Sequence, residues 1–480
     1  MVESSQIVSA APETQPQVRD RSNLILLVLC SAAFMAMLDT FIVNVAFKAI
    51  GEGYPGSTLS NLSWILNAYT IGYAALLIPA GRLADRFGRK RGFLVGLTVF
   101  TLASVACAVG PTLWWLVGFR VLQAVGAALL TPTSLGLLLT ALPAERRAGA
   151  VKIWATSTSL AAAVGPVVGG ALVKLSWQWV FLVNVPVGVI ALIGAVALLP
   201  ETEDVTVTRI PDLFGALILA IGLGALALAL VKGQEWGWSG SSTLIAFAAA
   251  AVAAALAIAR VLTHASPIVD PSLMKVRTFF WANVTALLFC TAFGAVLPSV
   301  VLRLEGGAGY SALATGLAVA PGPLMVPVFA AVGQRLAGRG WSAGYLVALG
   351  NSLVGVGAVA LAVSARTEVD YLTQLLPGWL IIGVGVGFSL PSLLASATVD
   401  LPPAQVSTGS GIVNTSRQLG YVLGVAMLVA LLGTLTASGN DALNGFRHSW
   451  WAIAAVALLS VFTALGITAR RRLDSVGRVS

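Results

Sequence analysis

Long apolar runs dominate this chain and restrict its fold more than any other feature. Fourteen such runs follow one another, with short polar segments between them. A helix of about 20 apolar residues crosses the hydrocarbon core of a bilayer, where backbone polar groups must bond to one another. The runs therefore predict an all-α polytopic membrane protein, with helices near residues 24–46, 61–80, 92–110, 113–140, 148–173, 180–199, 212–231, 242–263, 279–302, 312–333, 342–364, 371–397, 407–435 and 449–469.

Composition excludes a soluble fold. Only 10% of the residues are charged, whereas soluble domains carry about 25%. Lys and Arg outnumber Asp and Glu by 28 to 19, but the basic residues gather between the apolar runs. In that position they indicate membrane topology, so we expect no nucleic-acid partner.

The distribution of basic residues also predicts the orientation in the membrane. With the N-terminus in the cytoplasm, 20 basic residues fall on the inner side and six on the outer side. This bias is the one that the positive-inside rule describes. We therefore expect both termini inside, in a multi-pass protein of the plasma (inner) membrane.

The sequence offers no motif for a metal, a nucleotide or catalysis. The three cysteines lie within apolar runs and lack the spacing of metal ligands. The Gly-rich phosphate-binding loop of ATP-driven pumps is absent from the sequence. We therefore expect neither an enzyme nor a bound cofactor or metal, and any transport would draw its energy from an ion gradient.

Two similar loops indicate an internal repeat. Residues 81–91 read GRLADRFGRKR, and residues 333–339 read GQRLAGR, as a partial copy. Repeated halves with a site at their interface are a recurrent plan of transporters. The repeat predicts two six-helix bundles with an inserted pair of helices, in the following domains: tail 1–22, first bundle 23–200, inserted helices and linkers 201–270, second bundle 271–470 and basic tail 471–480.

Three charged residues lie well inside the apolar runs: Asp39, Arg120 and Arg417. A charge at the bilayer centre costs about 2.5–3.5 kcal/mol on insertion scales, so each one is a candidate for function. Asp39 and Arg120 each lie about seven residues from the outer end of their runs, and hence at the same depth. If their helices meet, Asp39 can bind and release a proton, or the two can form a static ion pair.

Other residues suggest a substrate contact, a hinge and a gate. Arg417 and its neighbour Gln418 lie mid-membrane, where Arg417 either contacts an anionic substrate group or pairs with helix carbonyls. In residues 165–170, proline bends the helix and glycines permit close packing, so this run is either a hinge or a kinked helix adapted to lipid. In residues 81–91, Arg86 or Arg89 can pair with Glu145 and hold the inner side shut, unless the loop is simply solvated.

Five segments resemble motifs of the major facilitator superfamily, specifically its 14-span drug:proton antiporters of the EmrB/QacA type. They are residues 38–46, 81–91, 120–126, 165–170 and 177–188. The chain departs from the family at Ala124 and Ala161, where the family has glycine. The resemblance covers about residues 24–470, and the 165–170 motif is the one that favours export.

The resemblance implies proton-coupled efflux (antiport) of an antibiotic, drug or toxic secondary metabolite by alternating access. The alternative is a proton-coupled importer or exporter of a small nutrient or endogenous metabolite. Expected partners are protons, the lipid bilayer and a small organic substrate, in a monomer. Because Asp39 is the single acid found in the runs, we expect a neutral, weakly cationic or anionic substrate.

The implied roles fall into four groups. The proton-coupling residues are Asp39 and Arg120. The candidates for the substrate cavity are Asn44, Gln123, Trp379, Asn414, Arg417 and Gln418. The gating loop comprises Gly81, Asp85, Arg86, Gly88, Arg89 and Glu145. The hinge comprises Gly165, Pro166, Gly169 and Gly170.

Overall fold

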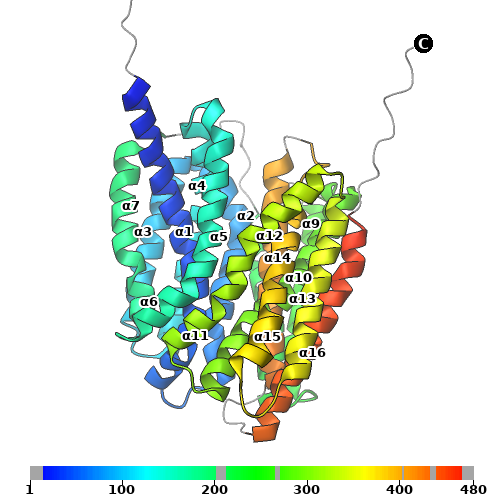
Figure 1. The fold of residues 1–480 in the computed structure, drawn as a ribbon. Coiled ribbons are helices and arrows are strands. Elements are labelled where there is room, and N and C mark those ends of the chain that lie inside the picture. The colour runs from blue at the N-terminus through cyan, green and yellow to red at the C-terminus, as the bar shows by residue number, and fades with distance from the viewer. Residues whose placement is uncertain (1–14, 202–211, 265–270, 403–404, 433–438, 468–480) are drawn as a thin grey trace, which may run out of the picture.

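The protein is a bundle of long helices (Figure 1). The computed structural model describes residues 15–201, 212–264, 271–402, 405–432 and 439–467. Within those residues, 14 helical segments are long and apolar enough to cross a membrane. The expected number of spans is therefore confirmed. The N-terminal tail before residue 15, both linkers of the inserted pair and the tail 471–480 lie wholly or largely outside the described residues.

The first bundle packs around small and aromatic side chains of its own helices. Its core joins α1, α2, α3, α4 and α7 through residues such as Phe93, Phe100 and Leu130, none of which is exposed. The bundle consists of α1 (Gln15–Gly53), α2 (Leu59–Phe87), α3 (Arg89–Ala108), α4 (Leu113–Ala141), α5 (Ala144–Val173), α6 (Trp179–Leu182) and α7 (Asn184–Leu198).

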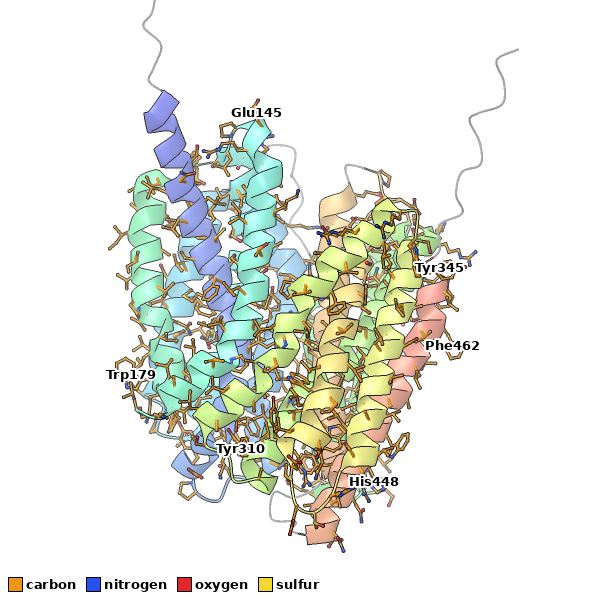
Figure 2. The ribbon with its side chains drawn as sticks, viewed as in Figure 1. Glu145, Trp179, Tyr310, Tyr345, His448 and Phe462 are labelled. Carbon is orange, nitrogen blue, oxygen red and sulfur yellow. The ribbon has the colours of Figure 1, made fainter. Side chains whose placement is uncertain are left out.

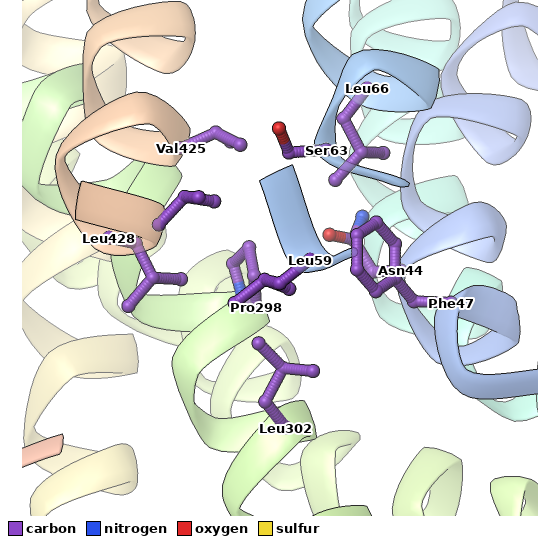
Figure 3. Close-up of a pocket in the computed structure, with 10 residues that line it drawn as sticks. Asn44, Phe47, Leu59, Ser63, Leu66, Pro298, Leu302, Val425 and Leu428 are labelled. Atoms are coloured by element: carbon purple, nitrogen blue, oxygen red, sulfur yellow. The ribbon is translucent and has the colours of Figure 1, made fainter. Parts of the chain in front are cut away.

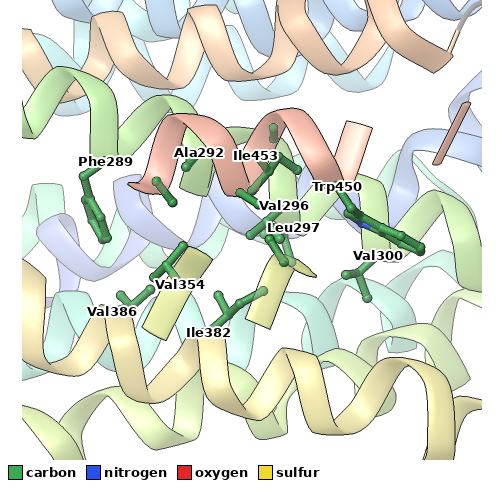
Figure 4. Close-up of a cluster of buried hydrophobic side chains, with 14 of the residues drawn as sticks. Phe289, Ala292, Val296, Leu297, Val300, Val354, Ile382, Val386, Trp450 and Ile453 are labelled. Carbon is green, nitrogen blue, oxygen red and sulfur yellow. The ribbon is translucent and has the colours of Figure 1, made fainter. Parts of the chain in front are cut away.

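The second bundle has a separate core of its own (Figure 4). Phe289, Val354, Ile382 and Trp450 meet there from four different helices. The bundle consists of η1 (Leu273–Lys275), α10 (Arg277–Leu302), η2 (Arg303–Gly307), α11 (Ala312–Val319), α12 (Pro321–Gly338), α13 (Ala343–Ser364), η3 (Tyr371–Leu375), α14 (Leu376–Ser396), α15 (Val406–Leu432) and α16 (Gly439–Leu465).

The helix boundaries differ from the expected runs at three places. α1 begins at Gln15, inside the expected tail 1–22. The expected span 180–199 is broken at Val183 into α6 and α7. The expected span 279–302 continues as the π-helical turn η2 as far as Gly307. Two of these differences involve buried polar residues: Asn184 follows the break at Val183, and Glu305 lies in η2.

α1 begins and α16 ends at the same end of the molecule (Figure 1). We call this the inner end, following the predicted orientation, and the opposite end the outer end. The location of the termini in the cytoplasm stays a prediction.

The two bundles meet along two seams. On one side α2 packs against α15, and on the other α5 packs against α11. Along the second seam, α5 packs mainly against α11 and only slightly against α12. Toward the inner end, α12 leans away from α5 (Figure 1). The conformation is therefore closed at the outer end.

The inserted pair, α8 (Leu213–Trp236) and α9 (Ser241–Thr263), covers the α2–α15 seam. α8 packs against α2, α15 and α9. Near its outer end, Lys232 donates to Asn61 of α2 at 2.8 Å and Gln234 donates to the carbonyl of Ala430 of α15 at 2.5 Å. α8 therefore contacts both bundles at once. At the inner end, Asp212 caps α8 and pairs with Arg260 of α9 at 2.8 Å.

Candidate functional site

The structure brings Asp39 and Arg120 together inside the first bundle. Asp39 of α1 and Arg120 of α4 are both 0% exposed. The Nη1 of Arg120 forms an ion pair with Oδ2 of Asp39. The shared depth expected from the sequence is therefore confirmed as a direct contact. Because neither group reaches solvent, the pair is held by its protein surroundings alone.

Two amide side chains complete the coordination of Asp39. Gln123 Nε2 and Asn184 Nδ2 donate to Asp39 Oδ1 at 2.9 and 3.0 Å. Ser104 of α3 accepts from Gln123 at 2.8 Å. Both carboxylate oxygens are thus satisfied by donors on α4 and α7. We call Asp39, Arg120, Gln123, Asn184 and Ser104 the Asp39 cluster.

Close packing of α3 on α4 makes this cluster possible. A Cβ built on Gly126 would lie 2.6 Å from the Phe100 amide nitrogen and 2.7 Å from the Gly96 carbonyl oxygen. Only glycine permits that approach. Gln123 lies one helical turn from Gly126, so the same approach brings it to Ser104.

Asn184 reaches Asp39 because the span breaks there. α6 ends at Leu182 and α7 begins at Asn184. Residues 177–188 resemble a family segment, but no role was expected for Asn184 itself. A single amide within the apolar run VFLVNV was the signal that could have identified it.

Arg120 also connects the cluster to α2. Its guanidinium lies 4.0 Å from the centre of the Tyr69 ring, and its Nε donates to the Ile65 carbonyl at 3.1 Å. The Tyr69 ring stacks on the Tyr73 ring, with centroids 6.2 Å apart. Tyr73 in turn lies within electrostatic reach of Arg417 on α15. Side-chain contacts therefore lead from Asp39 through Arg120 and Tyr69 to Tyr73 of α2, the helix that packs against α15 of the second bundle.

A cavity lies between the bundles in their outer half (Figure 3). Its wall is apolar except for Asn44 of α1 and Ser63 of α2. The second bundle contributes two helices to this wall: α10 with Pro298 and Leu302, and α15 with Val425, Leu428 and Val429. Asn44 therefore lies on the wall of this cavity, and its role as a substrate contact stays a prediction.

Asn414 and Gln418 share a helical face with Val425 of α15, because spacings of 11 and 7 residues return to nearly the same direction. Their side chains are half-buried and continue the face of the cavity wall toward the inner end. Arg417 donates to the Asn414 side chain at 2.9 Å and lies beside Tyr421.

Two candidates for the cavity lie elsewhere. Gln123 belongs to the Asp39 cluster. Trp379 of α14 is 2% exposed within the core of the second bundle, where its Nε1 donates to the Val319 carbonyl at 2.7 Å. It packs against Gly322, at the junction of α11 and α12. Hydropathy does not specify which way a helix is rotated, so these two positions could not be distinguished from the cavity wall by sequence.

The four residues of the expected hinge form a two-sided packing surface. Built Cβ atoms on Gly165 and Gly169 would lie 2.9 Å from Phe41 Cβ and 2.8 Å from Ile42 Cγ1, both on α1. Gly170 faces the other bundle, where a built Cβ would lie 2.7 Å from Leu313 Cα on α11. Pro166 lies within α5, which continues without a break. The role of a hinge stays a prediction.

The residues of the expected gating loop lie at the inner end: Gly81, Asp85 and Arg86 in the last turns of α2, Gly88 between the helices, and Arg89 at the start of α3. Arg89 pairs with Asp85 at 2.6 Å, and the φ of Gly88 is +109°, a conformation that favours glycine. A Cβ on Gly81 would lie 3.3 Å from Pro132 of α4. These contacts hold the loop against its own bundle.

The expected pairing of Glu145 with Arg86 or Arg89 is not made in this conformation, and it stays a prediction for the state in which the inner side is shut. Glu145 is exposed at the inner end of α5 (Figure 2), and the ion pairs among the described residues do not include it. Arg89 pairs with Asp85 instead, four residues away on the same loop. Arg86 lies 5.3 Å from the centre of the Phe87 ring. Hence this loop does not close against α5 through Glu145 here.

Asp39 is not the only buried acid, contrary to expectation. Glu305 in η2 is 3% exposed, and Arg303 in the same turn is also 3% exposed. Arg303 was expected on the outer side, and no role was expected for Glu305, because the apolar run ends at residue 302. The described residues contain no group of three or more His, Cys, Asp and Glu side chains able to hold a metal ion.

Comparisons with known proteins agree with this architecture. The sequence profile of the Major Facilitator Superfamily matches residues 29–425. The chain is 32% identical over 439 residues to the probable actinorhodin transporter of Streptomyces coelicolor, covering 88% of this chain and 75% of that protein. It is 32% identical over 449 residues to the methylenomycin A resistance protein of Bacillus subtilis, covering 93% and 92%. It is 30% identical over 414 residues to the multidrug resistance protein B homolog of Mycobacterium tuberculosis, covering 84% and 74%.

Solved structures share the fold at lower identity. A POT family transporter in complex with a thioalcohol-conjugated peptide has a TM-score of 0.68 at 17% identity, covering 92% of this chain and 94% of that one. A D-xylose–proton symporter has a TM-score of 0.65 at 13% identity, covering 93% and 98%. With a matching profile over most of its length and relatives above 30% identity, this multi-pass inner membrane protein belongs to the major facilitator superfamily.

Proposed function

We propose that the protein exports an antibiotic, drug or toxic secondary metabolite in exchange for protons, by alternating access of the central cavity to the two sides of the membrane. The observation that carries the proposal is the fully buried Asp39 cluster. A buried carboxylate with three polar partners on α4 and α7 is costly to place in a membrane protein, so it is a candidate for function by default.

Asp39 is the proposed proton carrier. Its ionised form is matched by the charge of Arg120 and by the amides of Gln123 and Asn184. A proton on Asp39 removes the Coulomb attraction and leaves Arg120 as an uncompensated buried charge. Breaking a buried pair in this way costs about 3–5 kcal/mol. The protonated state is therefore stable only if Arg120 finds a new environment.

Movement of Arg120 couples the proton to the cavity. Its guanidinium lies on Tyr69 of α2, and Tyr69 stacks on Tyr73 of the same helix, which packs against α15. α2 and α15 line one of the seams that alternating access must open and close. A shift of Arg120 thus acts on this seam through aromatic contacts, without a direct contact between proton and substrate.

The chemistry of the cavity supports an organic substrate of low polarity. Eight of the ten residues on its wall are apolar, and Asn44 and Ser63 offer a hydrogen-bonding amide and hydroxyl. Asn414 and Gln418 extend this pattern along α15. The names of similar proteins, which refer to actinorhodin, methylenomycin A and multidrug resistance, agree with export of such compounds.

The first experiment identifies a substrate. A sensitive strain that expresses the protein is grown against a panel of antibiotics that includes methylenomycin A and actinorhodin. We expect raised resistance to at least one compound. Inverted membrane vesicles then test whether that compound is taken up when a pH gradient, acidic inside the vesicle, is imposed.

The coupling is tested with Asp39→Asn, which keeps the size of the side chain and loses its charge. We expect gradient-driven uptake to fall to the level of empty vesicles, while the amount of protein in the membrane is unchanged. Glu368→Gln, at an exposed outer acid, is the matched control and should keep the wild-type rate. Wild-type uptake by Asp39→Asn would refute the coupling, and uptake driven in the opposite direction would favour import.

A further inference from the structure

The carboxyl group of Glu305 is buried at the outer end of the molecule without any hydrogen-bond partner. Its side chain is 3% exposed, and both carboxylate oxygens are unsatisfied. It lies in η2, the turn that extends α10 toward α11. Nothing comparable to the donors around Asp39 surrounds it.

The charges that act on Glu305 come from α1. Lys48 and Glu52, one helical turn apart and both exposed, act on it with opposite signs. Arg303 is directed elsewhere, since it donates to the Arg366 carbonyl and its guanidinium lies 5.4 Å from the centre of the Phe446 ring.

Among the described residues, the other elements that pack against η2 add no further charge near Glu305. α11, which packs against η2, contains no ionisable residue. Tyr310, between the two elements at the outer end (Figure 2), donates its backbone N–H to the Leu304 carbonyl at 3.0 Å. Lys48 and Glu52 oppose each other and are open to solvent, so they do not replace the missing donors.

An ionised carboxylate at this position would lose its hydration without gaining hydrogen bonds or an ion pair, which costs several kcal/mol. The neutral acid avoids most of that cost. Opening of the outer end would expose Glu305 to water, where a glutamic acid is ionised at neutral pH. Opening and closing of the outer end are therefore linked to loss and gain of one proton.

We propose that Glu305 is a proton-binding site that holds the outer end closed. When α1, η2 and α11 come together, a carboxylate oxygen of Glu305 takes a proton from the outer medium and forms an O–H bond. When they part, that bond breaks and the proton returns to the same medium. Glu305 thus adds nothing to the number of protons transported, but it makes the closed outer end more stable in acid.

The inference goes beyond the proposed efflux and does not rest on it, because its tests follow protonation and conformation in the absence of substrate. Infrared spectroscopy of the purified protein in lipid nanodiscs detects the C=O stretch of a protonated carboxyl group. Near pH 7 we expect this band in the wild type and in Glu368→Gln, and its loss in Glu305→Gln. A band that is unchanged in Glu305→Gln would overturn the assignment.

Conformation is followed by pulsed EPR between spin labels at Leu175→Cys and Leu372→Cys, exposed positions at the outer ends of the two bundles. The native cysteines are buried. The background variant Asp39→Asn removes the buried carboxyl group of the Asp39 cluster. We expect the ratio of open to closed populations to rise by about tenfold per pH unit while Glu305 titrates.

Glu305→Gln mimics the neutral acid and should keep the closed population constant across the pH range. Glu305→Leu, an apolar side chain of similar size, should do the same and shows whether a buried amide disturbs the fold. If either folded variant retains the pH dependence of its background, the proposal is wrong.

Discussion

Where α5 meets α11, glycine brings the two helix backbones together, and one methyl group added there should open the outer end. A Cβ built on Gly316 of α11 collides with the carbonyl oxygen of Pro166 on α5 and lies 2.8 Å from its carbonyl carbon. Both partners belong to helix backbones, so no side chain can rotate away. Gly316→Ala therefore acts on the seam itself.

The size of the effect follows from this geometry. An ordinary contact begins near 3.4 Å, so relief of the 2.8 Å contact alone separates the helices by roughly 0.6 Å. Overpacking of this kind costs about 1–3 kcal/mol. The cost applies to the outward-closed state alone, whereas the higher helix propensity of alanine, about 1 kcal/mol, is common to both states. The ratio of open to closed populations should thus rise about 5- to 150-fold.

Spin labels at Leu175→Cys and Leu372→Cys report this ratio as long and short distances. Gly118→Ala is the matched control, since a Cβ at Gly118 of α4 meets nothing within 4 Å. Unaltered distances in Gly316→Ala, or an equal shift in Gly118→Ala, would show that the α5–α11 contact does not determine closure.

Two further predictions concern the inner end. Burial alone would raise the pKa of Asp212, but a backbone N–H and Arg260 outweigh burial, and the pKa lies below its usual value. The ionised Asp212 therefore contributes its full stabilisation above the pKa of the unfolded state, and this stabilisation is lost as the pH falls through the pKa of the folded state. The variant Asp212→Asn can still cap α8. We expect it to lower the free energy of unfolding by about 1 kcal/mol at neutral pH and by little in acid. Thermal unfolding at both pH values measures this, and an equal loss at both would contradict it. Asp85→Asn removes the ion-pair partner of Arg89 and should slow uptake into vesicles severalfold. An equal loss of rate in Glu145→Gln would show that Glu145 also takes part in gating.

The membrane spans were predictable because a bilayer imposes one strong rule on length and polarity. The pairing of Asp39 with Arg120 was predictable for a related reason. Helices that cross the same layer share a depth scale, so the sequence alone placed the two charges at the same level. The prediction also assumed that the two helices are neighbours, as the family resemblance implies.

Rotation and local breaks were not predictable. Trp379 was expected on the cavity wall but faces the core, since an apolar run gives a helix no distinct face. Asn184 joins the Asp39 cluster because α6 and α7 meet at a break one residue before it. Glu305 is buried because α10 continues as a π-helical turn beyond its apolar run, which depends on packing with α11 and not on hydropathy.

The position of α8 has a consequence for exchange with the bilayer. By packing on both α2 and α15, it shields that seam from lipid tails. Among the described helices, the α5–α11 side is the one where the junction of the bundles faces the hydrocarbon directly. The inserted pair therefore makes the two seams unequal, because α8 covers one of them and none of the described helices covers the α5–α11 seam in the same way.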